Sequence, residues 1–154
     1  MLRLSKKADY ALMAMKHLAL RGDRGSSSAR EIAEQYGIPI ELMAKVLQRL
    51  VQRGLLASHQ GTRGGYHLAR LPGQISVADV IQAVEGPVTV TACSTDDGSC
   101  DQFAKCNVRD PLWKVRERIL TALGDCTIAE LAIEAPPATT MPASARAAVL
   151  HTNL

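Results

Sequence analysis

Two short helical segments joined by about three residues constrain the fold of this chain more than any other feature of its sequence. The first segment begins at Ser28, which forms a capping-box pattern with Glu31, and it ends at Gly37. The second begins at Pro39, a residue suited to a first helical turn, and it ends at Gly54. Because the connection is so short, the two helices must cross at a steep angle, which is the spacing of a helix-turn-helix.

A glycine-rich hairpin, or wing, is predicted directly after these helices. Two strand-like runs, Leu55–His59 and Tyr66–Ala69, flank a tip of sequence GTRGG that carries Arg63. A cation on such a ribbon can contact phosphate or enter a minor groove. Gly64 and Gly65 could instead serve only the turn.

Two further helices are expected to complete the core. Apolar residues recur at helical spacing over residues 8–22. After the wing, Ser76 and Asp79 form another capping pattern for a helix that stops at Gly86. The predicted fold class is therefore mainly α with a small β wing, and residues 1–87 are expected to form a winged helix-turn-helix domain.

The charge of the chain is divided between its halves. Residues 1–70 contain 12 Lys and Arg against 5 Asp and Glu, a net charge of +7, whereas residues 71–154 contain 6 against 10, a net charge of −4. This asymmetry favours a polyanionic partner for the front half, nucleic acid being the usual one. A solvated basic surface would show the same balance.

The second helix of the helix-turn-helix divides into two halves at about 100° per residue. The half predicted to pack inward is apolar: Leu42, Val46, Leu47, Leu50 and Val51. The other half offers side chains that can reach base edges in a major groove: Glu41, Ala44, Lys45, Gln48 and Gln52. A plain amphipathic surface helix would show the same division.

Three of the four cysteines lie in the stretch CSTDDGSCDQFAKC at residues 93–106, within a segment that lacks sustained periodicity. The N-terminus has neither a secretory apolar region nor a membrane span, so we expect a cytoplasmic protein without a membrane partner. In a reducing compartment, clustered cysteines more often bind metal or perform redox chemistry than form disulfides. We therefore expect residues 88–110 to form a cofactor-binding loop.

The spacing of these cysteines bears on the kind of cofactor. Thiolates bind zinc or iron-sulfur clusters, and the gaps here do not match the two tight pairs of a zinc knuckle, which favours a larger cluster. Cys93, Cys100 and Cys106 leave a fourth position for Cys126, a carboxylate, a histidine, water or a small thiol. Cys126 could equally be a packed thiol. Three unligated thiols in an exposed loop would invite oxidation.

A long helix is predicted from Asp110-Pro111 onward, and we expect residues 111–134 to contain it and a short helix capped by Thr127 and Glu130. The apolar repeat of the long helix consists of Leu112, Val115, Ile119 and Ala122, with Leu123 beside them. Such a stripe could pack on the chain's own core, but we expect it to form a homodimer, which a protein reading a palindrome needs. Residues 135–154 are expected to be a disordered tail.

Taken together, these motifs resemble the Rrf2 family of bacterial winged-helix regulators, and especially its SUF-system iron-sulfur assembly regulators. Over residues 1 to about 134 the resemblance is carried, in family order, by LRLSKKADYALMAMKHLA, EIAEQYGIPIELMAKVLQRLVQRGLL, GTRGGYHLAR, ISVADVIQAVEGP and three cysteines before a tryptophan-containing helix. The resemblance implies a dimeric transcriptional regulator, expected to be a repressor, that binds a double-stranded DNA operator. It further implies sensing of iron-sulfur cluster status, redox or nitric oxide, and control of cluster-assembly genes.

The resemblance also implies which residues form the sites. By position, the family's cluster ligands map to Cys93, Cys100 and Cys106, its DNA-reading helix to residues 39–53 and its wing to residues 56–69. The residues expected at the DNA interface are Ser28, Pro39, Glu41, Ala44, Lys45, Gln48, Arg49, Gln60, Arg63, Gly64 and Tyr66.

Departures from the family pattern bear on the cluster type. Members with a 2Fe-2S cluster place a histidine three residues after the last cysteine, where this chain has Arg109, which cannot ligate. Members similar to the nitric-oxide-sensing repressor use an aspartate of the first helix, from the partner subunit, and Asp9 looks like that residue. An acid at this place also suits the helix dipole alone. The gap between Cys93 and Cys100 is one residue longer than in those relatives. We favour 4Fe-4S, with 2Fe-2S as the alternative.

Two other classes of protein are alternatives to a cluster-sensing regulator. A zinc-stabilised DNA-binding regulator without cluster sensing would use the same thiolates. An enzyme is not expected, because the sequence has no glycine-rich dinucleotide turn, no nucleophile with an evident base and no paired catalytic acids.

Overall fold

The computed structural model describes residues 3–22, 25–91, 93 and 100–133. In these residues the elements follow the order α1 (Lys6–Arg21), α2 (Ala29–Tyr36), α3 (Ile40–Gln52), β1 (Leu56–His59), β2 (Gly65–Leu68), η2 (Pro72–Gln74), α4 (Val77–Glu85), α5 (Arg109–Asp125) and α6 (Ile128–Ala132). The predicted fold class, mainly α with a small β wing, is confirmed. The predicted tail, residues 135–154, lies outside the described residues.

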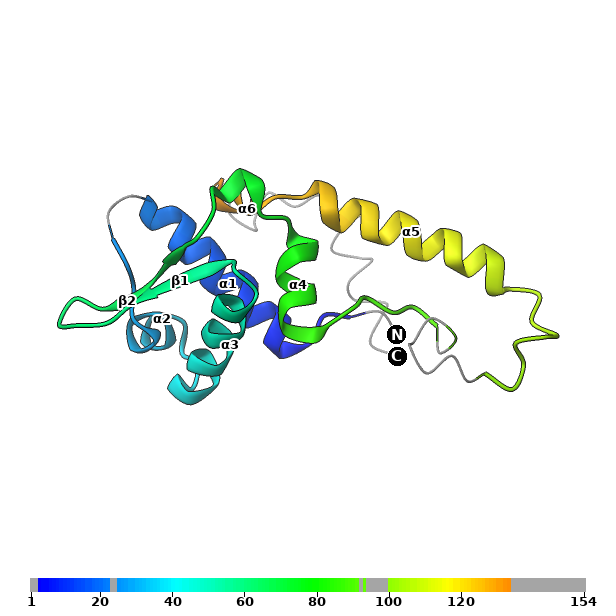
Figure 1. Cartoon of the computed structure of the whole chain (residues 1–154), viewed down its shortest axis with the longest axis horizontal. Coiled ribbons are helices and arrows are strands. Elements are labelled where there is room, and N and C mark those ends of the chain that lie inside the picture. The colour runs from blue at the N-terminus through cyan, green and yellow to red at the C-terminus, as the bar shows by residue number, and fades with distance from the viewer. Residues whose placement is uncertain (1–2, 23–24, 92, 94–99, 134–154) are drawn as a thin grey trace, which may run out of the picture.

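The arrangement consists of one compact body and one projecting helix. Figure 1 shows α1 to α4, the wing and α6 gathered together, with α5 extending from them as a long arm. The segment 100–108 lies at the end of α5 that is farthest from the wing (Figure 1). No helix within the described ranges is long and apolar enough to cross a membrane.

Local signals set the helix-turn-helix as the sequence predicted. The backbone N–H of Glu31 donates to Ser28 Oγ at 3.1 Å, and the N–H of Ser28 donates to Glu31 Oε2, which together form a capping box. Gly37 ends α2 in the left-handed region, at φ 64°, where glycine carries no Cβ penalty. Pro39 is the N-cap of α3, one position before the first helical turn in which we expected it.

The buried side of α3 differs slightly from the prediction. Val46, Leu47 and Leu50 are buried as expected, but Met43 is fully buried as well, while Leu42 and Val51 are only half-buried. At about 100° per residue the buried arc is centred between Met43 and Leu50, so Leu42 and Val51 form its two edges. The arc is wide because α3 contacts α1, α2 and α4.

The wing depends on close backbone approach at its glycines. Strands β1 and β2 pair antiparallel, from Leu56 opposite Leu68 to His59 opposite Gly65. Ser27 and Tyr66 add a bridge at the outer edge of β2 through backbone hydrogen bonds of 3.0 and 2.8 Å. A Cβ atom at Gly65 would lie 2.7 Å from the carbonyl carbon of Ser27. Gly65 is therefore required by its packing against the Ser27 backbone, and not by a left-handed turn conformation.

A buried histidine connects α1, α2 and the residue that pairs with the wing. His17 Nδ1 lies 3.2 Å from the Tyr36 hydroxyl, and its Nε2 lies 3.1 Å from Ser27 Oγ. Burial, and then the charge of Arg21, lowers the pKa of His17, so the ring bridges its partners as a neutral imidazole. The wing is thereby linked to the helical body through Ser27, whose backbone pairs with Tyr66 and whose hydroxyl contacts His17.

Helix α6 returns the chain to the body after α5. The N–H of Val77 donates to the carbonyl oxygen of Cys126 at 2.8 Å, and the N–H of Ile128 donates to that of Ile75 at 2.8 Å. The Ile128 side chain is fully buried in the main core. The C-terminal end of α5 is thus fixed to the helical body, whereas its N-terminal end adjoins the cysteine loop.

Candidate nucleic-acid interface and cysteine loop

The outward side of α3 carries free polar side chains. Glu41, Lys45, Gln48 and Arg49 are exposed, and Ala44 is half-buried beside them. In the described part of the chain the ion pairs join Arg30 to Glu34, Arg109 to Asp110 and Arg116 to Glu117, so none neutralises Lys45 or Arg49. This helix therefore presents uncompensated positive charge to solvent.

An open groove of 660 Å³ lies between α2, α3 and the wing. It brings together five residues that the sequence predicted for the DNA interface: Ser28, Gln48, Gln60, Gly64 and Tyr66. The groove is lined by hydroxyl, amide and phenol groups and by glycine backbone. These are the donors and acceptors with which proteins contact base edges and phosphates.

Arg63 lies at the exposed tip of the wing. Its carbonyl oxygen accepts a hydrogen bond from Ser26 Oγ at 3.2 Å, which holds the tip against the segment that precedes α2. The Arg63 side chain does not line this groove. The same holds for Pro39, Glu41 and Ala44. These four residues, predicted for the DNA interface, therefore lie outside the groove.

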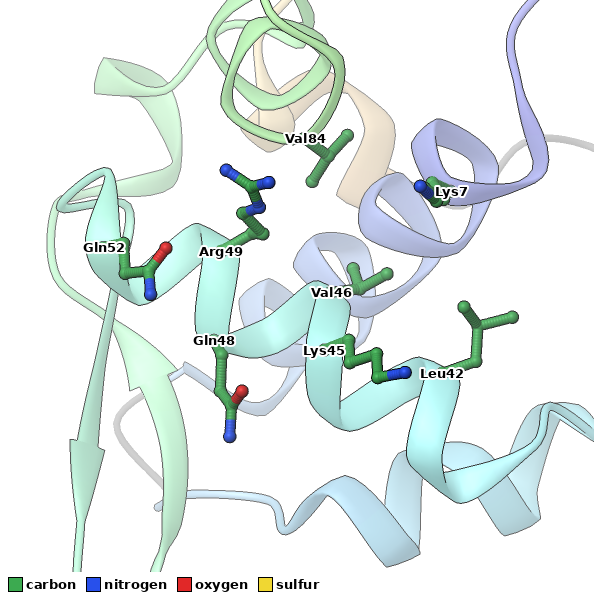
Figure 2. Close-up of a pocket in the computed structure, with 8 residues that line it drawn as sticks. All are labelled: Lys7, Leu42, Lys45, Val46, Gln48, Arg49, Gln52 and Val84. Atoms are coloured by element: carbon green, nitrogen blue, oxygen red, sulfur yellow. The ribbon is translucent and has the colours of Figure 1, made fainter.

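A second, smaller groove of 280 Å³ lies on the other side of α3, between that helix, the start of α1 and α4. Figure 2 shows Lys45 and Arg49 of α3 and Lys7 of α1 around it, with Val84 of α4 behind. Sequence reasoning missed Lys7. No local signal distinguishes it from its neighbour Lys6, because only the packing of α1 against α3 selects one of the two.

The cysteine loop connects α4 to α5. Cys93, Cys100 and Cys106 are free thiols, each half-buried, and Cys93 Sγ lies 3.2 Å from Thr91 Oγ1. Within the described ranges, no three His, Cys, Asp or Glu side chains stand close enough to hold a metal ion. The donor set fits an iron-sulfur cluster or zinc by its chemistry, since unpaired and partly accessible thiols are the ligands that both use.

Arg109 organises the N-terminal end of α5. Its guanidinium lies 4.5 Å from the centre of the Phe103 ring and donates to Asp110 Oδ1 at 2.9 Å. The pKa of Arg109 is raised, first by its hydrogen bond to Asp110 and the charge of that carboxylate, and more weakly by Cys106 and Cys93. Two of the three cysteines are therefore near one cation, which is suited to an anionic cofactor.

The two remaining candidate ligands lie on the helical body. Asp9 is half-buried in the first turns of α1, where its backbone N–H donates to the carbonyl oxygen of Ser5 at 3.0 Å. Cys126 packs beside Ala8, Val77 and Ile81. Burial, followed by the neighbouring Glu130, raises the pKa of the Cys126 thiol, so this residue has the surroundings of a packed thiol.

Helix α5 buries none of its side chains within its own chain. Of its apolar residues, Trp113 is 45% exposed and Val115 is 41% exposed. Its C-terminal half meets the body, where Leu123 packs on the cluster formed by Ala8, Val77 and Ile81, and Ile119 lines a cavity together with Ile81. The apolar stripe of α5 is thus only partly covered in the isolated chain, with Val115 and Ala122 exposed and Leu112, Ile119 and Leu123 half-buried.

Comparison with known proteins agrees with the fold and with the sequence motifs. Residues 4–134 match the Rrf2 family, described as "Iron-dependent Transcriptional regulator". The chain is 37% identical over 131 residues to the HTH-type transcriptional regulator IscR of Xenorhabdus nematophila, a match that spans 84% of this chain and 79% of that protein.

Solved structures give the same result. CymR, the global cysteine regulator of B. subtilis, is similar with a TM-score of 0.71 and 29% identity, over 86% of this chain and 97% of CymR. IscR of T. potens is similar with a TM-score of 0.69 and 29% identity, over 94% of this chain and 96% of that one. The resemblance seen in the sequence is confirmed, and the chain belongs to the Rrf2 family of winged-helix transcriptional regulators.

Proposed function

We propose that the protein is a cytoplasmic, homodimeric repressor, not an enzyme, whose cysteine loop holds an iron-sulfur cluster and whose affinity for its DNA operator depends on that cluster. The observation that carries the DNA-binding part is the groove between α3 and the wing, because it assembles Ser28, Gln48, Gln60, Gly64 and Tyr66 from three separate elements. The family's description as an iron-dependent transcriptional regulator supports control linked to iron, and the resemblance to SUF-system regulators makes iron-sulfur cluster assembly genes the proposed targets.

DNA recognition follows from this geometry. Helix α3 enters the major groove, where Lys45 and Gln48 extend from its outward side toward base edges. The wing follows the adjacent backbone, and Arg63 at its tip contacts phosphate or enters the minor groove. Phosphate contacts fix the position of the protein on the duplex, while contacts of α3 with base edges supply the sequence preference.

In the cysteine loop, Cys93, Cys100 and Cys106 would hold the cluster as thiolates, with the partner subunit's Asp9 as the proposed fourth ligand. When bound, such a cluster supplies a labile centre that responds to redox change or nitric oxide. Arg109 cannot ligate, so 4Fe-4S is favoured over 2Fe-2S. Instead, its positive charge would partly offset the negative charge of a thiolate at Cys106 or Cys93.

A route from the loop to the DNA-binding body runs through residues 76–124. The loop leads directly into α5, and the chain beyond α5 is fixed to the body by the backbone hydrogen bonds of Val77 with Cys126 and of Ile75 with Ile128. On the other side, Arg116 Nε donates to the carbonyl oxygen of Val88 at 3.2 Å, which connects α5 to the start of the loop. A cluster-dependent change in the loop would therefore reposition α4 and the two α3 helices of the dimer, and so couple the cluster to the operator.

The salt dependence of DNA binding tests the proposed interface. The probe is a duplex selected by the wild-type protein from a random-sequence pool. Arg63→Ala should weaken binding and make the plot of log affinity against log salt shallower by about one, because one phosphate contact is lost. Arg118→Ala on the exposed side of α5 removes the same charge far from the interface and should leave the slope unchanged. An unchanged slope for Arg63→Ala would remove this residue from the interface.

A further inference from the structure

The groove between α1, α3 and α4 has the features of an anion site. Three cationic side chains, Lys7, Lys45 and Arg49, line it together with the apolar side chains Leu42 and Val84. Figure 2 shows that the cations come from two different helices, with Lys7 on α1 facing α3. No acidic residue is among its lining residues. A negatively charged group placed here would meet several positive charges and an apolar floor that strengthens their attraction.

The position of Lys7 also needs a reason outside the isolated chain. Lys6 and Lys7 occupy the first turn of α1, where the helix dipole disfavours positive charge. The only acid in that turn is Asp9, and no ion pair of the described residues involves either lysine. Glu85 of α4, which accepts a hydrogen bond from Ser5 Oγ at the start of α1, is a second acid nearby, but neither lysine is held in an ion pair, so both stay available to a ligand.

The groove is continuous with the proposed DNA interface. Gln48 and Gln52, on the exposed side of α3, line both this groove and the larger groove beside the wing, so the two grooves adjoin along that side of the helix. In Figure 2, Gln48 extends away from Lys7 toward the other side of the helix. A helix inserted in a major groove about 12 Å wide has a phosphate backbone on each side of it. The wing lies on the side of α3 that faces one of these two DNA backbones. The groove beside α1 is therefore available to contact the other DNA backbone.

We propose that the groove between α1, α3 and α4 binds a phosphate group of the operator backbone, on the side of α3 opposite the wing, with Lys7 as its contact from α1. The inference rests on the proposed DNA-binding function and adds a helix outside the helix-turn-helix to the interface. At 280 Å³ the groove is below the usual range of about 300–1,000 Å³ for drug-sized ligands, which suits one phosphate with its water. Lys7 and Arg49 contribute affinity without sequence preference, whereas Gln48 reads bases.

Two neighbouring lysines provide a matched test. Lys7→Ala should lower the affinity for the selected duplex about fivefold at 0.15 M salt and make the salt slope shallower by about one, the effect of one lost phosphate contact. Lys6→Ala removes the same charge from the same turn but lies outside the groove, so its slope should equal that of the wild type. Lys7→Arg keeps the charge and should keep the slope. The ratio of specific to non-specific affinity should be unchanged in all three variants.

The outcomes separate this inference from the function on which it rests. If wild-type protein binds the selected duplex but Lys7→Ala and Lys6→Ala have the same slope, the phosphate site is wrong while the DNA-binding function stands. If the wild-type protein selects no duplex, the proposed function itself fails. Protection of Lys7 from acetylation by the duplex, but not by inorganic phosphate at the same ionic strength, is expected for a site on the DNA backbone. Equal protection by inorganic phosphate would overturn the assignment to DNA.

Discussion

Cys100→Ser and Cys106→Ser should each leave the anaerobically purified protein with almost no iron or acid-labile sulfide. A serine hydroxyl is a harder donor than a thiolate and is not deprotonated near neutral pH, so it does not replace a cysteine ligand. The loop offers no spare thiol, since Cys93, Cys100 and Cys106 are the cysteines that precede α5. Loss of one ligand therefore leaves too few thiolates for a stable cluster.

Cys126→Ser is the matched control for these variants. The Cys126 thiol packs beside Ala8 and Val77, and its pKa is raised by burial, so it is expected to remain protonated and unligated. This variant should keep the iron and sulfide content of the wild type. The cluster assignment would be contradicted by full iron and sulfide in the Cys100 and Cys106 variants, or by zinc without sulfide in the wild type, which would support a zinc-stabilised regulator instead.

Val115→Asp should convert the dimer to a monomer and lower operator affinity by about two orders of magnitude or more. Val115 is 41% exposed on α5, in the apolar stripe with Leu112 and Ile119, so a charge there does not disturb packing within the chain. At a dimer interface the same carboxylate would be buried without a partner, which is strongly unfavourable. A monomer contacts one half-site and loses the gain that comes from linking two binding units.

Thr121→Asp places the same charge on the opposite side of α5. Thr121 is exposed, and its hydroxyl donates only to the carbonyl oxygen of Glu117 one turn earlier, at 2.9 Å. Sedimentation velocity should show this variant as a dimer with wild-type operator affinity. A dimeric Val115→Asp protein, or a monomer that still binds the full operator as tightly as the wild type, would refute the role given to α5.

The elements that could be predicted from sequence are those set by local chemistry. The capping boxes at Ser28, Ser76 and Thr127 occur as their spacing indicated, because each needs only a hydroxyl and an acid three residues later. The strands of the wing shifted by one residue at their ends, and α5 began at Arg109 rather than at Asp110. Boundaries of this kind depend on the fraying of terminal turns.

The features that sequence reasoning missed are set by contacts between distant segments. Met43 is buried because α3 packs on several helices at once. Dividing the helix into one apolar and one polar half does not take these several contacts into account. His17 is buried because Ser27 and Tyr36, far along the chain, supply its hydrogen bonds. Gly65 is required by the backbone of Ser27, and Lys7 is selected over Lys6 by the position of α3.

The cysteine site shows the same limit. The spacing of the three thiols indicates a cofactor. How the three cysteines are arranged around it depends on the cofactor itself and on a fourth ligand, neither of which the spacing identifies. Asp9 lies on α1 of the body, whereas the segment 100–108 lies at the far end of α5 (Figure 1). The proposed ligation by Asp9 therefore requires the second subunit of the dimer.

The most direct test of the account is the operator affinity of one anaerobic preparation, measured at fixed salt before and after removal of its cluster with a chelator. Coupling between the cluster and the DNA predicts a change of about 5- to 150-fold, the usual range for two linked sites. The direction of the change identifies which form occupies the operator. Identical affinities for the cluster-bound and cluster-free protein would contradict the central claim that this regulator senses its cluster.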